Sequence, residues 1–323
     1  MSEISVSVVV PTHNRAHLLG RLVKALGDQD GAVAFEVVVV DDASTDATRR
    51  TLQQLAATAP FPLLPVHRGT NGGAAAARNA GWRAAGGSVI LFTDDDCAPQ
   101  PGWVATLARA AGAADIVQGT TLPDPAQVGN LGPFSHTIEV TREAGEYETC
   151  NMAYRREVLE ALGGFGEEFR HPYGEDTDLA WRAKDAGFRS GFAPDAVVYH
   201  DVRPSAFGAY LRDRRRREGM VLTLRNHPAL RRRLWAGAFL HQSHAATMAT
   251  AVTALAMARR PTPTRAAAAA GSAVWYAWNC RKTRPRPPRT RDWISVVPAA
   301  FVADLYEVAV VARAAARYRT PVI

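Results

Sequence analysis

Three neighbouring aspartates follow an apolar run in the segment LFTDDDCAP, residues 91–99. Like charges at this spacing repel one another, so a bound cation makes their crowding favourable. Carboxylates, phosphate oxygens and water are the ligands that Mg²⁺ prefers in proteins. Asp94 and Asp96, two positions apart, are expected to point the same way from an extended segment, and a solvated turn is the alternative. The segment therefore predicts a site for a divalent metal and an anionic diphosphate.

A second pair of carboxylates, Glu175 and Asp176, lies in the segment HPYGEDTDLAWRAKDAGF, residues 171–188. Gly174 predicts a sharp turn before them, and the apolar spacing after them predicts a helix. A carboxylate in such a place is a candidate general base, because it can take a proton from an attacking hydroxyl. The alternative is an acidic first turn that only complements the helix dipole.

Short apolar runs alternate with helical stretches through the first two hundred residues. Val6–Val10, Val37–Val40 and Ser88–Phe92 are continuous apolar runs, and leucines at helical spacing follow the first of them. Apolar strands separated by helices are typical of a parallel sheet that is covered on both faces. We therefore predict an α/β fold with a Rossmann-like, mostly parallel sheet and helices on both faces.

Polar residues come directly after each of these runs, where sheets of this kind bind ligands. Asp41 and Asp42 can accept hydrogen bonds from a base or ribose, although they would also suit a turn and a helix cap. The pair Gly72-Gly73 allows the backbone to approach a ligand closely. The residues expected to line this ligand-binding edge are Pro11, Thr12, Asn14, Arg15, Asp41, Asp42, Gly72, Arg78, Asp94 and Asp95.

Charge divides the chain into two segments. Up to His200 there are 16 basic and 25 acidic residues, and from Asp201 onward there are 22 basic and 6 acidic residues. This contrast predicts two domains, residues 1–202 and 203–323. The three cysteines have no paired spacing, so neither a disulfide framework nor a zinc signature is expected, and a reducing compartment is the default. No basic stretch precedes the first apolar run, so no signal peptide is expected.

Residues 4–202 resemble the family 2 glycosyltransferases of GT-A fold. The motifs that carry the resemblance are VVVPTHNR, VVVVDDASTDAT, NGGAAAARNAGW, ILFTDDDCAP, GGFGEEF and GEDTDLAWRAKDAG, in the order seen in that family. The resemblance implies an inverting transfer from a UDP-, GDP- or dTDP-linked sugar to an acceptor hydroxyl, aided by Mg²⁺ or Mn²⁺. It also implies that Asp42 contacts the nucleotide, with Asp41 beside it. Asp176 matches the catalytic base, with Glu175 as a supporting or alternative one.

Asp94–Asp96 match the metal and ribose site of the family, but three adjacent carboxylates leave the register open. We favour Asp96 as the main metal ligand. Asp95 is expected either to contact the ribose or to support the metal ligands from behind. Asp94 is assigned to either role. His200 matches a further metal or phosphate ligand of some relatives, and a purely structural histidine is the alternative.

The basic segment after residue 202 allows three interpretations. Its arginine clusters flank uncharged stretches at 234–258 and 266–280, which are poor or short membrane spans. We favour helices that lie on an anionic membrane surface, which would suit a glycan or lipid-linked acceptor and a peripheral place on the cytoplasmic face of the cell membrane. A helical subdomain that packs on the catalytic domain is the second interpretation. Nucleic-acid binding is not expected, because no nucleic-acid module is recognised.

Other functions fit parts of the pattern. A phosphatase that uses an Asp-x-Asp nucleophile would carry that motif after its first strand, whereas the three aspartates follow the third apolar run. A sugar nucleotidyltransferase would carry a glycine-rich loop after the first strand, and PTHNR has no glycine. A dinucleotide dehydrogenase lacks its glycine fingerprint here. A non-catalytic, membrane-bound protein that binds nucleotide sugars is the non-enzyme alternative, against which the Glu175-Asp176 pair argues.

Overall fold

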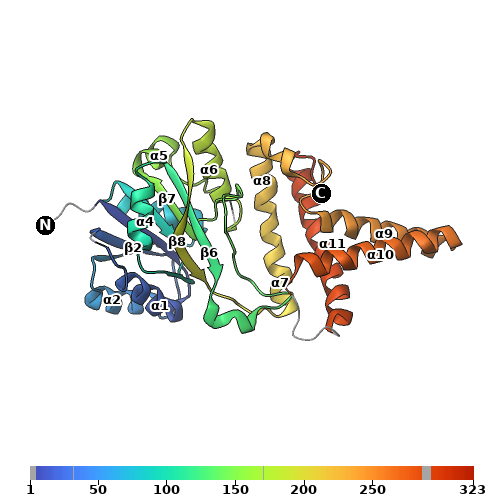
Figure 1. Cartoon of the computed structure of the whole chain (residues 1–323), viewed down its shortest axis with the longest axis horizontal. Helices are drawn as coiled ribbons and strands as arrows, with labels where there is room; N and C mark the ends of the chain where they lie inside the picture. Colours follow the sequence, from blue (N-terminus) through green and yellow to red (C-terminus); the bar gives the residue numbers. More distant parts are fainter. Residues whose placement is uncertain (1–4, 32, 170, 286–291) are drawn as a thin grey trace. The chain divides into compact units, whose positions relative to one another are not determined.

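The computed structural model describes residues 5–31, 33–169, 171–285 and 292–323. The chain forms two compact units (Figure 1). Unit 1 comprises Met1–Gln127 and Thr137–Asp201, and unit 2 comprises Val128–His136 and Val202–Ile323. The short segment 128–136 thus belongs to unit 2, although unit 1 surrounds it in the sequence. What each unit does stays a prediction at this point.

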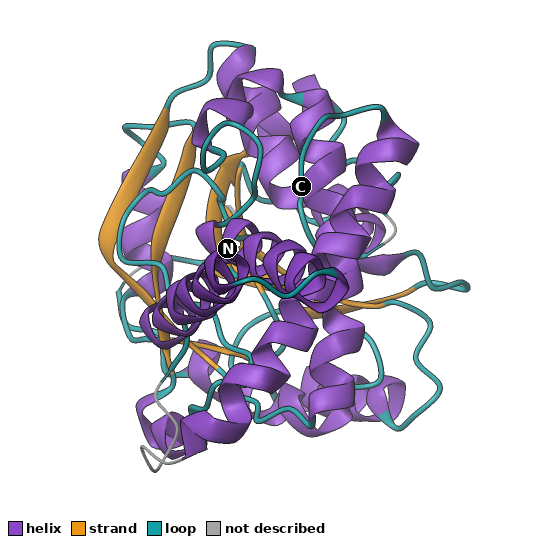
Figure 2. Ribbon diagram, turned by 90° about the vertical axis from the view of Figure 1, so that its right-hand side faces the viewer, coloured by secondary structure: helices purple, strands orange, loops and turns teal. Residues whose placement is uncertain are grey.

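Unit 1 is built on one eight-stranded sheet with the order β3-β2-β1-β4-β7-β6-β8-β5, drawn in orange in Figure 2. The strands are β1 Val6–Thr12, β2 Phe35–Asp41, β3 Leu63–His67, β4 Val89–Thr93, β5 Cys97–Pro99, β6 Ile116–Pro123, β7 Asn151–Arg155 and β8 Ser190–His200. The pairs β1–β2, β2–β3, β1–β4 and β6–β8 are parallel, whereas β4–β7, β6–β7 and β5–β8 are antiparallel. The prediction of a mostly parallel sheet is confirmed.

Helices cover both faces of this sheet. They are α1 Ala16–Gly27, α2 Thr48–Thr58, α3 Gly73–Ala84, α4 Trp103–Ala110, α5 Arg156–Leu162 and α6 Glu175–Asp185. Side chains alternate along β1, so that Val8 and Val10 join the apolar cluster of α1, α2 and α4. Val9 joins the cluster of α3, α5 and α6 on the other face. Each valine is fully buried, which stabilises the sheet by about 1.5–3 kcal/mol per side chain.

The strand register brings the polar residues of the sequence motifs to one edge of the sheet. Thr12 at the end of β1 is aligned with Asp41 at the end of β2. β4, on the other side of β1, ends at Thr93 just before the three aspartates. In the antiparallel pair at the sheet margin, Cys97 of β5 lies opposite His200 of β8. Residues far apart in sequence are thereby positioned by rigid, buried strands.

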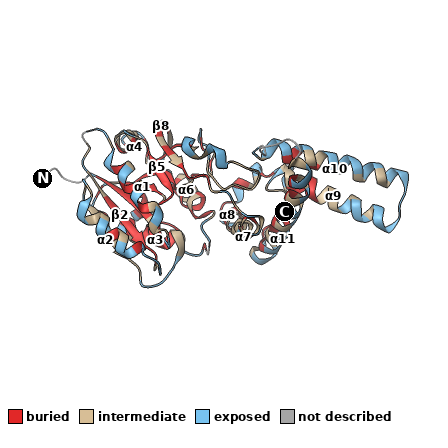
Figure 3. Ribbon diagram, turned by 90° about the horizontal axis from the view of Figure 1, so that it is seen from below, coloured by how far each residue is buried: buried red, intermediate tan, exposed pale blue. Residues whose placement is uncertain are grey.

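Unit 2 is helical. It contains α7 Phe207–Arg214, α8 Glu218–Asn226, α9 Gln242–Arg259, α10 Pro263–Thr283 and α11 Trp293–Tyr318, with 3₁₀ turns at Arg215–Arg217 and Pro228–Arg233. A further 3₁₀ turn, Pro125–Asn130, lies where the chain passes from unit 1 into segment 128–136. Ala246, Tyr276, Cys280 and Ala300 form an apolar cluster shared by α9, α10 and α11. The far ends of α9 and α10 are largely exposed (Figure 3).

Among the described residues, one helix, α11, is long and apolar enough to cross a membrane. It nevertheless carries two buried carboxylates, Asp304 and Glu307. Glu307 lies 2.9 Å from Arg214 and 3.1 Å from Arg217, and Asp304 accepts a hydrogen bond of 2.9 Å from Tyr276. These pairs tie α11 into the interior of unit 2. The uncharged stretch 234–258 is not one helix, because α9 begins only at Gln242.

Candidate active site

The loops that follow β1 and β2 are bound to each other through Asn14. Asn14 has a positive φ of 53°, which asparagine tolerates better than most residues. Its side-chain oxygen accepts hydrogen bonds of 2.8 Å from the Thr45 amide and 3.3 Å from the Asp46 amide. The backbone amide of Asn14 donates to the Ser44 hydroxyl at 2.8 Å. Asn14 therefore fixes the shape of this edge of the sheet.

The two acids at the end of β2 bind backbone amides. Asp41 accepts from the Ser44 amide at 2.9 Å, and His67 lies 3.2 Å from its other oxygen.

Asp42 accepts from the amides of Gly72 and Gly73, at 3.1 and 2.7 Å. A Cβ atom at position 72 would lie 2.6 Å from the mobile Arg68 guanidinium and 2.9 Å from the Cβ of Ala76, so glycine fits this position best. Asp42 thus anchors the start of α3 beside the sheet.

Arg78 on α3 connects the end of β4 with the start of α6. Its guanidinium donates to Asp94 at 2.9 Å and to Glu175 at 2.9 Å. Arg78 and Glu175 are 4% and 2% exposed, so the ion pair between them is shielded from water. The side chain of Asp94 is 24% exposed and is the most open of the three aspartates. The acids of the two sequence motifs therefore share one site.

Asp95 points into the protein. It accepts from the Thr12 hydroxyl at 2.7 Å and from the Arg15 guanidinium at 2.6 Å. Burial raises the pKa of Asp95 to about 6, even though Arg15 opposes that rise. The segment 94–96 is a turn between β4 and β5, so the expected extended geometry is wrong. Because Asp94 and Asp96 pair with different neighbours, the alternation argument does not apply to them.

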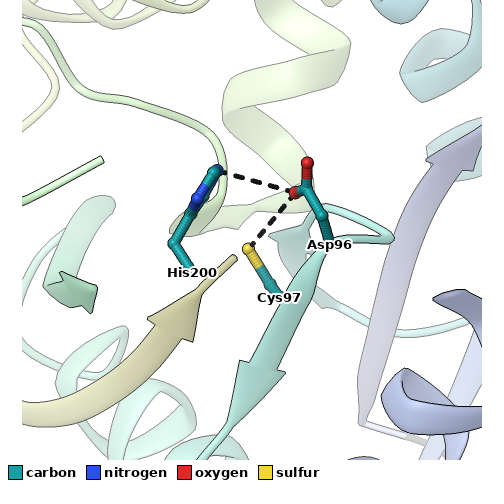
Figure 4. A group of neighbouring side chains, drawn as sticks. All are labelled: Asp96, Cys97 and His200. Atoms are coloured by element: carbon teal, nitrogen blue, oxygen red, sulfur yellow. Dashed lines mark hydrogen bonds and ion pairs between the residues drawn. The ribbon is translucent and has the colours of Figure 1, made fainter. Parts of the chain in front are cut away.

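Asp96 lies with Cys97 and His200 in a buried group of three potential metal ligands (Figure 4). The distance from His200 Nε2 to Asp96 Oδ1 is 3.6 Å, and the distance from Cys97 Sγ to the same oxygen is 3.9 Å. Arg15 holds the other carboxylate oxygen of Asp96 at 3.0 Å. His200 Nδ1 lies 2.8 Å from the carbonyl oxygen of Asp201, which can only accept, so Nδ1 carries a proton. Nε2 consequently faces Asp96.

Glu175 and Asp176 begin α6 after Gly174, whose φ of 95° makes the turn that the sequence predicted. Glu175 is held by Arg78, whereas Asp176 is partly exposed and accepts from the Thr177 amide at 2.8 Å. Burial, the charge of Glu175 and the charge of Glu148 raise the pKa of Asp176 well above its ordinary value. A raised pKa suits a residue that has to accept and release a proton near neutral pH.

Comparison with known proteins agrees with this arrangement. Residues 7–163 match the family model described as Glycosyl transferase family 2, and residues 89–279 match that of Glycosyl transferase family group 2. The chain belongs to the family 2 glycosyltransferases. The phosphatase, the nucleotidyltransferase and the non-catalytic binding protein are therefore set aside in favour of a glycosyltransferase.

Similar curated proteins are themselves glycosyltransferases. The chain is 29% identical to glycosyltransferase AglE of Haloferax volcanii over 218 residues, which is 64% of this chain and 69% of AglE. It is 31% identical to the pre-mycofactocin glycosyltransferase of Mycobacterium tuberculosis over 218 residues, which is 62% of this chain but 44% of that protein. The match thus spans less than half of the mycobacterial relative.

Solved structures of the same fold confirm the GT-A architecture of this glycosyltransferase. Mannosyltransferase PcManGT from Pyrobaculum calidifontis, in complex with GDP-Man and Mn²⁺, has a TM-score of 0.63 at 24% identity, covering 94% of this chain and 86% of its own. S. aureus TarS 1–349 in complex with UDP-GlcNAc has a TM-score of 0.56 at 16% identity, covering 99% and 93%. At these identities the likeness concerns the fold.

The structure divides the predicted site residues of the glycosyltransferase into three groups. The first contains Asp41, Asp42 and Gly72 around the start of α3. The second contains Thr12, Arg15, Asp95, Asp96 and His200, which extend from the end of β1 to the end of β8. The third contains Arg78, Asp94 and Glu175, with Asp176 as the next residue of α6. Pro11 is a strand residue paired with Val40, and Asn14 connects the loops.

The sequence analysis missed three residues that belong to this site. Cys97 directly follows the aspartates, but the absence of a second nearby cysteine gave no metal-site pattern. Arg68 lies 3.1 Å from Asp42, and a single arginine in a loop carries no recognisable signal. Glu148 lies in an irregular stretch, receives a hydrogen bond of 2.9 Å from Gln118, and acts on the pKa of Asp176. Only the tertiary structure brings Glu148 near Asp176 of α6.

Proposed function

We propose that this chain transfers a sugar from a nucleoside-diphosphate sugar to an acceptor hydroxyl with inversion at the anomeric carbon. The acceptor oxygen forms the new bond to that carbon as the bond to the diphosphate oxygen breaks. The electron pair of the broken bond stays on the departing nucleoside diphosphate. The hydroxyl proton passes to a carboxylate of the protein. The observation that supports this most is the bridge by which Arg78 joins Asp94 to Glu175.

Asp176 is the carboxylate that we assign as the base. Glu175 is buried and engaged by Arg78, so it supports the site electrostatically and holds the start of α6. Asp176 is the more exposed of the two, which leaves it open to an acceptor. Its raised pKa makes it a stronger base, once it is ionised, than an ordinary aspartate.

The donor site that we propose lies along the sheet edge. Asp42 would contact the nucleotide, with Asp41 beside it, and backbone amides, including that of Gly72, hold both carboxylates at this edge. Thr12 and Arg15 hold Asp95 behind the metal ligands, and Asn14 keeps the two loops in register. The donor class is a UDP-, GDP- or dTDP-linked sugar, and two solved neighbours carry GDP-Man and UDP-GlcNAc.

A divalent ion, Mg²⁺ or Mn²⁺, is part of this proposal. Asp96 and His200 would hold it, and Asp94 is proposed as a further ligand of the ion or as a partner of the donor ribose. Asp96 and His200 fit a divalent ion, because a carboxylate oxygen and an imidazole nitrogen face each other at 3.6 Å in a buried place. When bound, the ion would stabilise the negative charge that develops on the leaving diphosphate. Arg15 and Asp201 orient its ligands.

Unit 2 is proposed to rest on the anionic cytoplasmic face of the cell membrane, where a glycan or lipid-linked acceptor would be reached. Residues 219–291 contain 13 arginines and lysines and no acidic residue. The hairpin of α9 and α10 turns its hydroxyls inward, since Thr253 contacts Ser272 at 2.8 Å. Its larger apolar side chains face outward, with Val274 70% and Trp278 54% exposed. Polar contacts inside and apolar side chains outside are typical of helices in contact with lipid.

Replacing the base tests the catalytic part of the proposal. Asp176→Asn removes the proton acceptor while keeping the size of the side chain, so we expect kcat to fall by about 10²–10⁴-fold. Donor binding, measured by calorimetry with Mn²⁺ present, is expected to stay within about twofold. The matched control is Asp195→Asn, which changes an exposed aspartate of β8. Normal turnover by Asp176→Asn would exclude this residue as the base.

A further inference from the structure

We propose that Cys97 is a third protein ligand of the metal site, which makes that site suited to a thiophilic divalent ion such as Zn²⁺ or Co²⁺. This inference rests on the metal site of the proposed function and changes its chemistry. Mg²⁺ takes oxygen ligands, whereas a set of one carboxylate, one thiolate and one imidazole favours zinc-like ions. The predicted set of Asp94, Asp96 and His200 did not include a sulfur.

The strand pairing is what brings the sulfur to the site. Cys97 of β5 and His200 of β8 are directly opposite each other in an antiparallel pair. Side chains of opposite residues leave the same face of the sheet, with Cβ atoms roughly 4.5–5.5 Å apart. Asp96 reaches them from the turn that precedes β5, so all three point to one place (Figure 4).

The distances are close to those of a bound ion. Cys97 Sγ and His200 Nε2 lie 3.9 and 3.6 Å from Asp96 Oδ1, and the three ligand atoms are within 4.8 Å of one another. Tetrahedral zinc with bonds of about 2.0–2.3 Å separates its ligands by roughly 3.3–3.8 Å. Side-chain adjustments of less than about 1 Å would therefore bring three ligands onto one ion, leaving a fourth position for a donor phosphate or water.

The surroundings hold two of these ligands in place. The Nδ1 proton of His200 is bonded to the Asp201 carbonyl, which orients Nε2 toward the group. Such a contact is typical of histidines that bind metal. Arg15 holds the second oxygen of Asp96, and all three ligands are at most 4% exposed. Binding would replace the thiol proton of Cys97 by the metal ion and release that proton to solvent.

Cobalt spectroscopy tests the proposal without an activity measurement. Co²⁺ bound to a thiolate gives a near-ultraviolet charge-transfer band that is absent for oxygen and nitrogen ligands. We expect the wild-type chain to develop this band with one Co²⁺ per chain and to lose it when excess Zn²⁺ is added. A wild-type chain without the band overturns the proposal, and this result needs no variant.

Variants identify the sulfur. Cys97→Ser and Cys97→Ala are expected to lose the band and to bind Zn²⁺ at least tenfold more weakly, with unchanged circular dichroism. Cys280→Ser, a buried cysteine of unit 2, is the matched control and is expected to keep the band. Cys150 is buried beside the Thr121 hydroxyl, at 3.6 Å, and Cys150→Ser is expected to keep the band as well. A band that survives in folded Cys97→Ala, or that disappears only in Cys150→Ser, contradicts the assignment.

Transfer assays keep this inference separate from the proposed function. If wild-type chain with Mg²⁺ transfers sugar but never shows the cobalt band, the thiol ligand is wrong and the transfer mechanism stands. If the band depends on Cys97 but Asp176→Asn turns over normally, the metal ligand stands and the catalytic assignment fails.

Discussion

At the scale of single residues, the site is organised by arginines that each hold two acids. Arg15 pairs with Asp95 and Asp96, and Arg78 pairs with Asp94 and Glu175. Two guanidiniums thereby neutralise much of the repulsion among four carboxylates. The planar, fixed donors of arginine suit this task, since one side chain can direct hydrogen bonds to two acceptors. A lysine at either position would supply the charge without the geometry.

The pKa of Asp176 gives a prediction about pH at the same scale. Its pKa is raised by burial and by the charges of Glu175 and Glu148, so activity is expected to rise with pH as Asp176 loses its proton. Glu148→Gln removes one of those negative charges and lowers the pKa. We expect the acidic limb of the plot of kcat/KM against pH to move to lower pH.

The matched control for Glu148→Gln is Glu157→Gln, which changes an exposed glutamate at the start of α5. The pH profile of that variant is expected to coincide with the wild-type profile. An acidic limb that stays in place in Glu148→Gln, with the fold intact, would show that Glu148 does not act on the base.

The sequence predicted the residue types of the site better than their partners. The identities of Asp94, Asp176 and Arg78 as site residues followed from motifs. Their connection did not, because Arg78 bonds to residues 16 and 97 positions away along the chain. The directions of the three aspartates were also beyond the sequence, since a turn rather than a strand carries them. The sequence gives the positions of the three aspartates along the chain, whereas the conformation of the turn determines the direction of each side chain.

At the scale of elements, the strands and the helical character of unit 2 could be predicted, whereas the ion pairs that hold α11 could not. β1, β2 and β4 are buried on both faces, so each is a continuous apolar run in the sequence. α11 is equally apolar, yet its two acids pair with basic or hydroxyl groups from α7, α10 and the turn 215–217. Hydropathy alone does not reveal that a helix as apolar as α11 carries two paired, buried acids.

The buried cluster around Glu307 supplies a prediction about stability. Burial alone would raise the pKa of Glu307, but Arg217, His244 and Arg214 outweigh it and hold that pKa well below its ordinary value. Glu307→Gln leaves two guanidiniums without their counter-charge. Because both arginines are about one-fifth exposed, we expect a loss of roughly 2–3 kcal/mol of unfolding free energy, measured by urea denaturation at pH 7.

The sign of the pH effect follows from the lowered pKa of Glu307. The carboxylate contributes stability that is fully present above its unfolded pKa of about 4.3 and is lost as pH falls toward the folded value. The wild-type advantage over Glu307→Gln is therefore expected to shrink below about pH 4. Glu160→Gln, at an exposed position of α5, is the control. An unchanged stability of Glu307→Gln at pH 7 would contradict the role of the cluster.

At the scale of the whole molecule, charge is divided between the two units. The acidic segment carries the sheet and its site, and the basic segment forms the helices. Arg214 and Arg217 belong to the folded interior through Glu307, so they are not free to bind a membrane. Arg259 and Arg260, at the exposed junction of α9 and α10, are among the arginines that a membrane surface would meet.

Vesicle flotation tests this membrane proposal. The chain is expected to float with vesicles that contain anionic lipid at low salt and to be released as salt shortens the range of the electrostatic attraction. Changing Arg259→Gln and Arg260→Gln together is expected to weaken binding by roughly 2 kcal/mol, about 30-fold. The control changes Arg49→Gln and Arg50→Gln, another exposed adjacent pair, in unit 1. Wild-type chain that never floats would rule out the membrane surface as its partner.

The segment 128–136 has a consequence for how this protein can be divided. Its Phe134 stacks edge-on against Phe207 and Tyr210, and His136 forms backbone hydrogen bonds with Arg203. A fragment that stops at residue 201 would therefore keep nine residues whose packing partners have been removed. Exchanging the helical part for that of another transferase needs two grafts, one at this insertion and one at the carboxyl end. The two units alternate along the sequence and are not interchangeable modules.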